Sequence, residues 1–441
     1  MKNLGRVLTV SEFLLQLAAS REAGTPLGIY SVCSAHPLVI KAAVQQAVAD
    51  GSHLLIEATS NQVNQFGGYT GMRPADFVSF VTAIADDEGL AREKLILGGD
   101  HLGPNPWQQL PAAEAMKHAE RMVMGYASAG FTKIHLDCSM ACQDDSTPMD
   151  EHLVAERAAR LCAVAEGTSG GREICYIIGT EVPVPGGATE SLSELVVTPP
   201  ENAHRTMKIH RKAFSNAGLS DAWDRVIAIV VQPGVEFNHD SVIDYDPGKA
   251  QLLQQVLEST RGFVYEAHST DYQRPAAYRE LVQDGFAILK VGPALTFALR
   301  EALFGLAAIE QELIACDQRS GMRDILEDAM LSNPPYWNHH YHGDERAQYI
   351  LRQYSYSDRV RYYWTDPKVQ KAVEKLIRNI DSTHIPETML SQYLPEQYAA
   401  MRAGKVISRA EGLLLHKIRT ALAPYADACR ATQDAAAGAL R

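Results

Sequence analysis

The fold is decided by residues 95–136, where two short apolar runs flank an amphipathic segment. The first run is Leu-Ile-Leu-Gly-Gly at 95–99, and Asp-His-Leu-Gly-Pro-Asn-Pro-Trp follows it at 100–107. Apolar residues recur at helical spacing over 112–129, and the second run, Lys-Ile-His-Leu, occupies 133–136. This pattern is typical of a strand–helix–strand unit whose parallel strands are buried on both faces.

The same unit repeats along the chain. The eight expected strands are Leu27–Val32, Leu54–Ala58, Leu95–Gly99, Lys133–Leu136, Ile174–Gly179, Val226–Val231, Phe263–Ala267 and Phe286–Val291. A helical pattern follows each strand, the last of them over Leu295–Ile314. Eight alternating units in about 290 residues predict an α/β fold of the TIM (β/α)8 barrel class, with an open doubly wound sheet as the alternative.

The pattern changes near residue 318. Asn-Pro-Pro-Tyr-Trp at 333–337 interrupts it. Segments with helical periodicity follow, and they are rich in aromatic and charged residues. We therefore expect a barrel over residues 1–318 and an all-helical C-terminal extension over 319–441. Its Trp and Tyr residues indicate that the extension packs on the barrel or on a partner subunit.

Composition excludes several classes of protein. The formal net charge of −12 argues against a nucleic-acid binder. No apolar run reaches the roughly 18 residues of a membrane span, and residues 1–10 do not resemble a secretory signal. Seven scattered cysteines fit reduced thiols, so we expect a cytoplasmic protein, and we expect it to be a homo-oligomer. The motifs of dinucleotide binding, P-loop phosphoryl transfer and serine hydrolases are missing.

Polar residues gather where the expected strands end, which is where barrels carry their active sites. The third strand ends in Asp100 and His101, a pair that suits a proton-transfer group beside a metal ligand or a hydrogen-bonded turn. Alternation places His135 and Asp137 of the fourth strand on one face, where each is equally compatible with a structural role. The fifth strand leads into Glu181, a carboxylate that needs a cation nearby if it is buried.

The remaining strand ends add further candidates. Gly186 and Gly187 suit either a flexible loop that closes over the substrate or a plain turn. Glu236 follows the sixth strand. His268 follows the seventh strand. Strands three, five, six and seven thus each bring an Asp, Glu or His to one mouth, which predicts a divalent-metal site. Mixed imidazole and carboxylate ligands suit Zn²⁺, which we expect, or Mn²⁺ as the alternative.

Long strings in the sequence resemble the GatZ/KbaZ family over essentially the whole chain. They are GGDHLGPNPW at 98–107, VQPGVEF at 231–237, YEAHSTDYQ at 265–273, LKVGPALTFALR at 289–300, RYYW at 361–364 and SQYLP at 391–395. The resemblance implies the larger subunit of D-tagatose-1,6-bisphosphate aldolase, earlier labelled tagatose-6-phosphate kinase, which supports a separate class II aldolase subunit. Some relatives are described as ketose or ketose-6-phosphate 4-epimerases.

A more distant similarity to class II metal-dependent aldolases implies roles for single residues. It implies Asp100 and Glu181 as catalytic residues and His101, Glu236 and His268 as metal ligands, with His239 as the alternative to Glu236. The phosphate-binding runs of those enzymes are replaced here by Ser-Thr-Asp at 269–271 and Gly-Pro-Ala at 292–294. The expected substrate-binding residues are Asp137, Gly186, Gly187, Ser269, Asp271 and Lys290.

Two functions follow from the residues and the resemblance together. In the first, a bound divalent ion and Asp100 act on a ketose or ketose phosphate, breaking the C3–C4 bond. Release of the aldehyde is aldol cleavage, and its rotation and recombination is C4 epimerisation between fructose-type and tagatose-type sugars. In the second, the chain is a non-catalytic subunit that stabilises a separate class II tagatose-bisphosphate aldolase.

Overall fold

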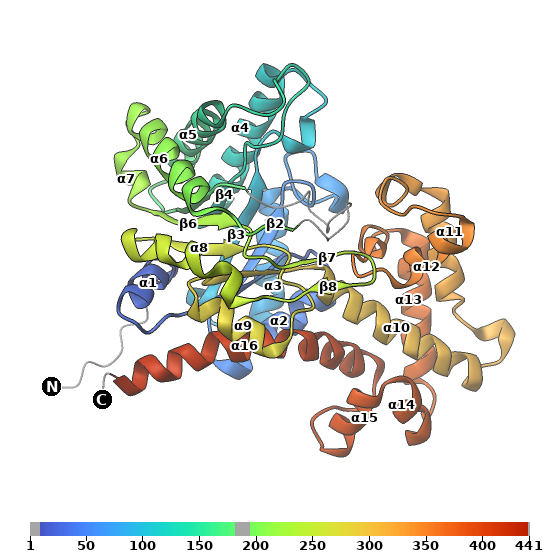
Figure 1. The fold of residues 1–441 in the computed structure, drawn as a ribbon. Coiled ribbons are helices and arrows are strands. Elements are labelled where there is room, and N and C mark those ends of the chain that lie inside the picture. The colour runs from blue at the N-terminus through green and yellow to red at the C-terminus, as the bar shows by residue number, and fades with distance from the viewer. Residues whose placement is uncertain (1–8, 181–194, 440–441) are drawn as a thin grey trace.

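The computed structural model describes residues 9–180 and 195–439, with side chains up to residue 430. Its centre is a closed barrel of eight parallel strands in the order β1-β10-β9-β6-β5-β4-β3-β2 (Figure 1). The strands are β1 (Ile29–Val32), β2 (Leu54–Thr59), β3 (Leu95–Leu102), β4 (Lys133–Leu136), β5 (Cys175–Ile178), β6 (Val226–Val231), β9 (Val264–Ala267) and β10 (Ile288–Val291). Ile29 of β1 lies opposite Ile288 of β10, so the ring is closed. The predicted TIM barrel is confirmed and the open sheet was the wrong alternative.

Helices surround this barrel in strict alternation with its strands. They are α2 (Pro37–Asp50), α3 (Pro74–Asp87), α4 (Ala112–Ala129), α5 (Glu151–Thr168), α6 (Pro200–Asn216), α8 (Pro247–Ser259), α9 (Pro275–Gln283) and α10 (Pro293–Leu313). Prolines open six of them, α2, α3, α6, α8, α9 and α10. Proline is favoured at the first helical position because its missing N–H would have no partner there and its φ already fits the helix.

A helix before β1, a two-stranded hairpin and a single helical turn were not predicted. Helix α1 (Val10–Glu22) precedes β1, and its Phe13, Leu14 and Leu17 share a buried cluster with inward-facing strand residues, so α1 covers one end of the barrel. Between β6 and α8 lies a small antiparallel hairpin, β7 (Glu236–Phe237) and β8 (Val242–Ile243). A single turn, α7 (Ser220–Trp223), follows α6.

The extension after α10 is helical, as expected. It consists of α11 (Met322–Ser332), α12 (Glu345–Tyr354), α13 (Pro367–Asp381), α14 (Glu387–Tyr393), α15 (Pro395–Arg402) and α16 (Ala410–Ala439), with short 3-10 turns between them. Helix α16 returns along the barrel and packs against α2, α9 and α10 (Figure 1). The boundary at residue 318 remains a prediction, because the last helix packs with the barrel.

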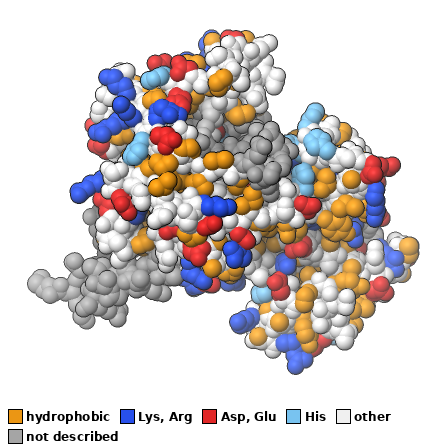
Figure 2. Space-filling model, in the orientation of Figure 1, with side chains coloured by type: hydrophobic (Ala, Val, Ile, Leu, Met, Phe, Trp, Pro, Cys, Tyr) orange, Lys and Arg blue, Asp and Glu red, His pale blue; other side chains and the backbone are white. Residues whose placement is uncertain are grey.

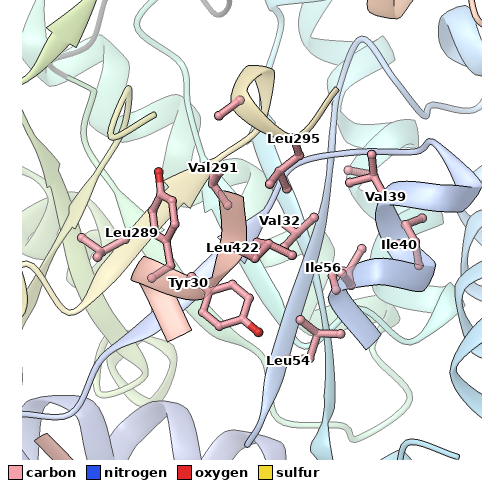
Figure 3. Packing of buried hydrophobic residues seen from close by; sticks show 14 of the residues in the cluster. Tyr30, Val32, Val39, Ile40, Leu54, Ile56, Leu289, Val291, Leu295 and Leu422 are labelled. Atoms are coloured by element: carbon pink, nitrogen blue, oxygen red, sulfur yellow. The ribbon is translucent and has the colours of Figure 1, made fainter. Parts of the chain in front are cut away.

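The barrel and α16 share one apolar core. Leu422 of α16 lies among Tyr30 and Val32 of β1 and Leu289 and Val291 of β10 (Figure 3). All of these side chains are buried. At about 25 cal/mol per Å² of apolar surface removed from water, contacts of this kind supply the main stabilisation of the fold.

Over the face in Figure 2, acidic and basic side chains are interspersed. In the described part of the chain, no helix combines the length and the apolar character needed to cross a membrane. All seven cysteines are described, and none of them is in a disulfide bond.

Candidate active site and metal centre

Four side chains meet at the mouth formed by the strand ends. They are Asp100, His101, His135 and His268, all buried, and each offers a ligand atom within 4.8 Å of the others. The end of β3 supplies the first two, β4 supplies His135, and His268 follows β9. The sequence singled out three of the four and left His135 between a structural and a functional role.

The shape of β3 brings Asp100 and His101 into this position. The pairing of β3 with β4 shifts register between Gly99 and Leu102, and His101 adopts a left-handed φ of 49°. A Cβ at Gly103 would lie 1.6 Å from the carbonyl oxygen of Asp137. Only glycine therefore allows the chain after β3 to approach the chain after β4 this closely. A strained non-glycine φ of this kind persists only where the surrounding structure holds it, and it is common at functional sites.

Two of the histidines are oriented by buried carboxylates. His101 Nδ1 lies 2.7 Å from Asp137 Oδ2, and His268 Nε2 lies 3.0 Å from Glu266 Oε1. The other nitrogen of His101, Nε2, is 3.9 Å from Asp100 Oδ2. A carboxylate that fixes one ring nitrogen while the other faces a shared point is the usual arrangement around protein-bound metals. Asp137, predicted to bind substrate, therefore lies behind His101.

The pKa values of the two rings, His101 and His268, are shifted in opposite directions. Burial lowers the pKa of His268 to about 4, so this ring is neutral at pH 7 and has a lone pair to donate. Burial also acts to lower the pKa of His101, but Asp100 and the hydrogen bond to Asp137 outweigh it and raise that pKa above its ordinary value.

His135 and Asp100 lie within hydrogen-bonding distance of each other. His135 Nε2 lies 2.9 Å from the carbonyl oxygen of Gly179, and its Nδ1 lies 3.1 Å from Asp100 Oδ1 and 3.3 Å from the backbone nitrogen of His101. A proton on Nδ1 makes the contact with Asp100 a hydrogen bond. A proton on Nε2 instead leaves a lone pair on Nδ1, and a divalent metal then suits both groups.

Beneath this cluster, the barrel interior holds a network of ion pairs. Lys133 Nζ lies 2.6 Å from Glu57 Oε1 and 2.6 Å from Glu266 Oε2. Lys290 Nζ pairs with Glu57 and lies 2.8 Å from Asp100 Oδ1. Burial acts to raise the pKa of Glu266, but Lys133 and Lys290 outweigh it and hold that pKa well below its ordinary value.

Negative charge exceeds positive charge in this interior. Within this network and the cluster above it, with the carboxylates that orient its histidines, the buried carboxylates are Glu57, Asp100, Asp137 and Glu266, and the buried ammonium groups are Lys133 and Lys290. Four carboxylates minus two ammonium groups leave two excess negative charges, apart from any proton on the histidines. Uncompensated buried charge is costly, and one divalent cation would balance it.

Glu57, Lys133 and Glu266 were not predicted as site residues. The sequence did contain a sign of their role, because each is a charged residue inside an apolar strand. A charge buried in this way is tolerated only when an opposite charge faces it across the barrel.

Glu236 and His239 lie apart from the cluster. Glu236 is buried on β7, where its Oε1 accepts the N–H of Phe237 at 3.0 Å and burial raises its pKa to about 7. His239 Nδ1 lies 3.1 Å from Ser355 Oγ, and its Nε2 lies 3.0 Å from the carbonyl oxygen of His340. Both ring nitrogens of His239 are thus engaged with the extension. The four-residue cluster includes His135 and does not include Glu236 or His239, the ligand and its alternative that the resemblance implied.

A cavity of about 780 Å³ opens above the cluster. Asp100, His101 and His268 lie in its wall, and the predicted Ser269, Asp271 and Lys290 line it as well. The extension completes the wall with Arg361, Tyr362 and Trp364. The predicted Glu181, Gly186 and Gly187 lie outside the described residues. The sequence missed the contribution of the extension, because no local pattern shows which helical residues return to a barrel mouth.

Comparison with known proteins agrees with this architecture. A crystal structure of a probable tagatose 6-phosphate kinase from Sinorhizobium meliloti 1021 is 51% identical over 91% of this chain and 100% of its own, with a TM-score of 0.85. A fructose-bisphosphate aldolase from Campylobacter jejuni is 12% identical over 84% of this chain and 92% of its own, with a TM-score of 0.44. The profile of the D-tagatose-1,6-bisphosphate aldolase subunit GatZ/KbaZ-like family matches residues 14–430. The chain therefore belongs to the GatZ/KbaZ-like family of D-tagatose-1,6-bisphosphate aldolase subunits.

Proposed function

We propose that this chain is a metal-dependent enzyme that makes and breaks the C3–C4 bond of a ketose or ketose phosphate. The observation that carries the proposal is the pair of carboxylate-oriented histidines beside Asp100, with Asp137 behind His101 and Glu266 behind His268. The cavity of about 780 Å³ has room for a sugar above them.

The residues that would hold the metal are His101, His135 and His268, with Asp100 close to all three. Zn²⁺ is the ion we expect, and Mn²⁺ is the alternative. A divalent ion bound there would polarise the ketose carbonyl as a Lewis acid. Glu181 and Glu236 remain candidates from the sequence for the catalytic and ligand roles.

The chain's own groups account for the proton transfers. Asp100 is ionised, because Lys290, His101 and the hydrogen bond to His135 outweigh the effect of burial and hold its pKa well below its ordinary value. Its carboxylate accepts the proton of the C4 hydroxyl as the C3–C4 bond breaks, and the bonding electrons pass to an enediolate over C2 and C3. The positive Lys290 beside this carboxylate offsets the negative charge that forms at the mouth.

The fate of the aldehyde decides the reaction. If it leaves, the outcome is aldol cleavage. If it rotates and recombines, the proton returns from Asp100 to the new C4 oxygen and the product is the C4 epimer. The assay is incubation of the full chain and a divalent metal salt with fructose, tagatose and their 6-phosphates, followed by NMR detection of C4 epimers and three-carbon products.

A second function is favoured by the subunit description of the family. Here the chain stabilises a separate class II aldolase subunit and has no turnover alone. Under this alternative, cleavage should appear only when such a subunit is added, and Asp100→Ala in this chain should leave that cleavage unchanged.

Metal binding gives a test that does not depend on turnover. Protein freed of metal with a chelator should bind about one Zn²⁺ per chain, measured by calorimetry. Asp137→Asn should weaken binding by roughly 10- to 100-fold, because the carboxylate that orients His101 and strengthens it as a ligand is lost. Asp240→Asn, which changes an exposed carboxylate on the hairpin, should leave the affinity unchanged. Absence of binding by the unmodified chain would rule out the metal-dependent mechanism.

A further inference from the structure

We propose that Arg361 of the helical extension binds an anionic group of the substrate, a phosphate or a carboxylate carried at the end of the sugar away from the reacting carbons. This inference rests on the proposed function, since it places the substrate in the same cavity. It gives the extension a direct part in recognising an anionic substrate.

The first observation is that Arg361 lines the cavity without an acidic partner. Its Nη1 donates to the carbonyl oxygens of Ser357 and Asp358, and its Nη2 donates to Tyr362 Oη at 3.2 Å. Among the described residues, no carboxylate forms an ion pair with it within 4.0 Å, and Asp358 and Asp271 act on it only at longer range. The guanidinium is therefore held in place while part of its donor set faces the cavity.

Buried arginines near the extension contrast with Arg361, which is half-buried. Arg352 Nη2 lies 2.6 Å from Glu327 Oε1, and Arg300, on α10, lies 2.9 Å from Asp358 Oδ1. Arg359 also lacks a carboxylate partner among the described residues, but it donates to the carbonyl oxygen of Tyr336 and does not line the cavity. The guanidinium of Arg361 is held in position but has no carboxylate paired with it, in a protein whose net charge is −12. Such a group is suited to binding an anionic ligand.

Aromatic contacts hold this wall of the cavity together. The Arg361 guanidinium lies 4.7 Å from the centroid of the Tyr362 ring, which stacks on Tyr336 at 4.9 Å. Tyr69, from the loop after β2, meets Tyr362 edge-on at 4.8 Å and joins the wall to the barrel. Burial acts to raise the pKa of Tyr362, but Arg361 and Arg359 outweigh it and lower that pKa below its ordinary value. The wall thus carries a positive field where the extension meets the mouth.

The second observation is that the usual anion position of a barrel is filled by the chain itself. Barrels commonly bind phosphate at the loops after the seventh and eighth strands and at a helix N-terminus there. Here Asp271 Oδ1 accepts the backbone N–H groups of Gly292 at 3.0 Å and of Ala294 at 2.8 Å, at the start of α10. A substrate phosphate at this point would find those donors occupied and would lie beside a carboxylate. Two described Lys or Arg side chains line the cavity, Lys290 and Arg361. Lys290 is paired with Glu57 and Asp100, so Arg361 is the one left to receive the phosphate.

The test measures binding of sugars by the full chain loaded with Zn²⁺. Calorimetry is done with tagatose 6-phosphate, with a ketohexuronate, with neutral tagatose and with inorganic phosphate. Arg361→Gln should weaken binding of the anionic sugars by about 10- to 100-fold, the loss expected for a charge-assisted hydrogen bond, and should leave neutral tagatose unchanged. The ratio between the phosphate and the carboxylate sugar identifies the natural anion.

Arg346→Gln is the matched control. Arg346 is exposed on α12 and also packs over a tyrosine ring, 5.2 Å from the centroid of Tyr349, but it does not line the cavity. This variant should bind every probe as the unmodified chain does. Equal affinity of Arg361→Gln and Arg346→Gln for the anionic sugars would overturn the proposal, as would an equal loss for neutral tagatose. Because the readout is binding, a chain with no turnover still tests the role of Arg361.

Discussion

Asp100→Asn is expected to lower turnover of the ketose by roughly 10²- to 10⁴-fold, the usual contribution of a positioned general base. Asparagine keeps the size of the side chain and its hydrogen-bonding oxygen but accepts no proton from the C4 hydroxyl. The variant should remain folded, because Lys290 keeps its pairing with Glu57. The measurement is the rate of C4 epimer or three-carbon product formation at saturating substrate.

A second readout separates the two roles open to Asp100. If Asp100 acts chiefly as the proton acceptor, Asp100→Asn should still bind about one Zn²⁺ per chain. If it acts chiefly as a ligand, turnover and zinc affinity should fall together. Asp240→Asn serves again as the exposed control and should keep full turnover. A rate for Asp100→Asn within threefold of the unmodified protein would remove it from the mechanism.

Lys133→Met should destabilise the protein by about 3–5 kcal/mol, which is the usual cost of removing one partner of a buried ion pair. Lys133 is fully buried and lies between Glu57 and Glu266 at 2.6 Å from each. Methionine fills a similar volume but leaves two carboxylates with Lys290 as the remaining ammonium group. The expected result is a lower urea midpoint of unfolding.

The pH dependence of this loss has a definite sign. Glu266 has a depressed pKa in the folded protein, so its ion pairs add stability above the ordinary carboxylate pKa and lose it as the pH falls. The difference between Lys133→Met and the unmodified protein should therefore stay constant from pH 7 down to about 4.5, the ordinary glutamate pKa, and shrink as the pH is lowered further toward the depressed pKa of Glu266. Lys208→Met, on an exposed position of α6, should unfold at the same midpoint as the unmodified protein. Equal midpoints for both variants would show that the interior network is neutral for stability.

The barrel could be predicted because its signal is local and repeated. Each strand is a short apolar run and each helix has an apolar face. The β3–α4–β4 unit can therefore be predicted from residues 95–136 alone. Helix α1 was missed although Thr9 and Glu12 form a capping box there. The β7–β8 hairpin was missed because two-residue strands have no periodicity to detect.

The site could be predicted in part, for a related reason. Asp100, His101 and His268 sit at strand ends, and the barrel brings all strand ends to one mouth. His135, Glu57 and Lys133 lie within strands, so their function depends on which residues face them across the barrel. Arg361 lies in the extension, far from the mouth along the chain. Pairings of this kind depend on tertiary packing, which the order of residues along one strand or helix does not reveal.

The return of α16 to the barrel has a consequence for synthesis on the ribosome. Leu422 covers the seam where β1 meets β10, so the first and eighth strands remain partly exposed until the last helix emerges. A nascent chain that ends near residue 318 would have every strand and still present an open apolar seam. Exposed seams of this kind are prone to association with other chains. We therefore expect fragments that end before α16 to aggregate, because the apolar seam between β1 and β10 stays exposed in them.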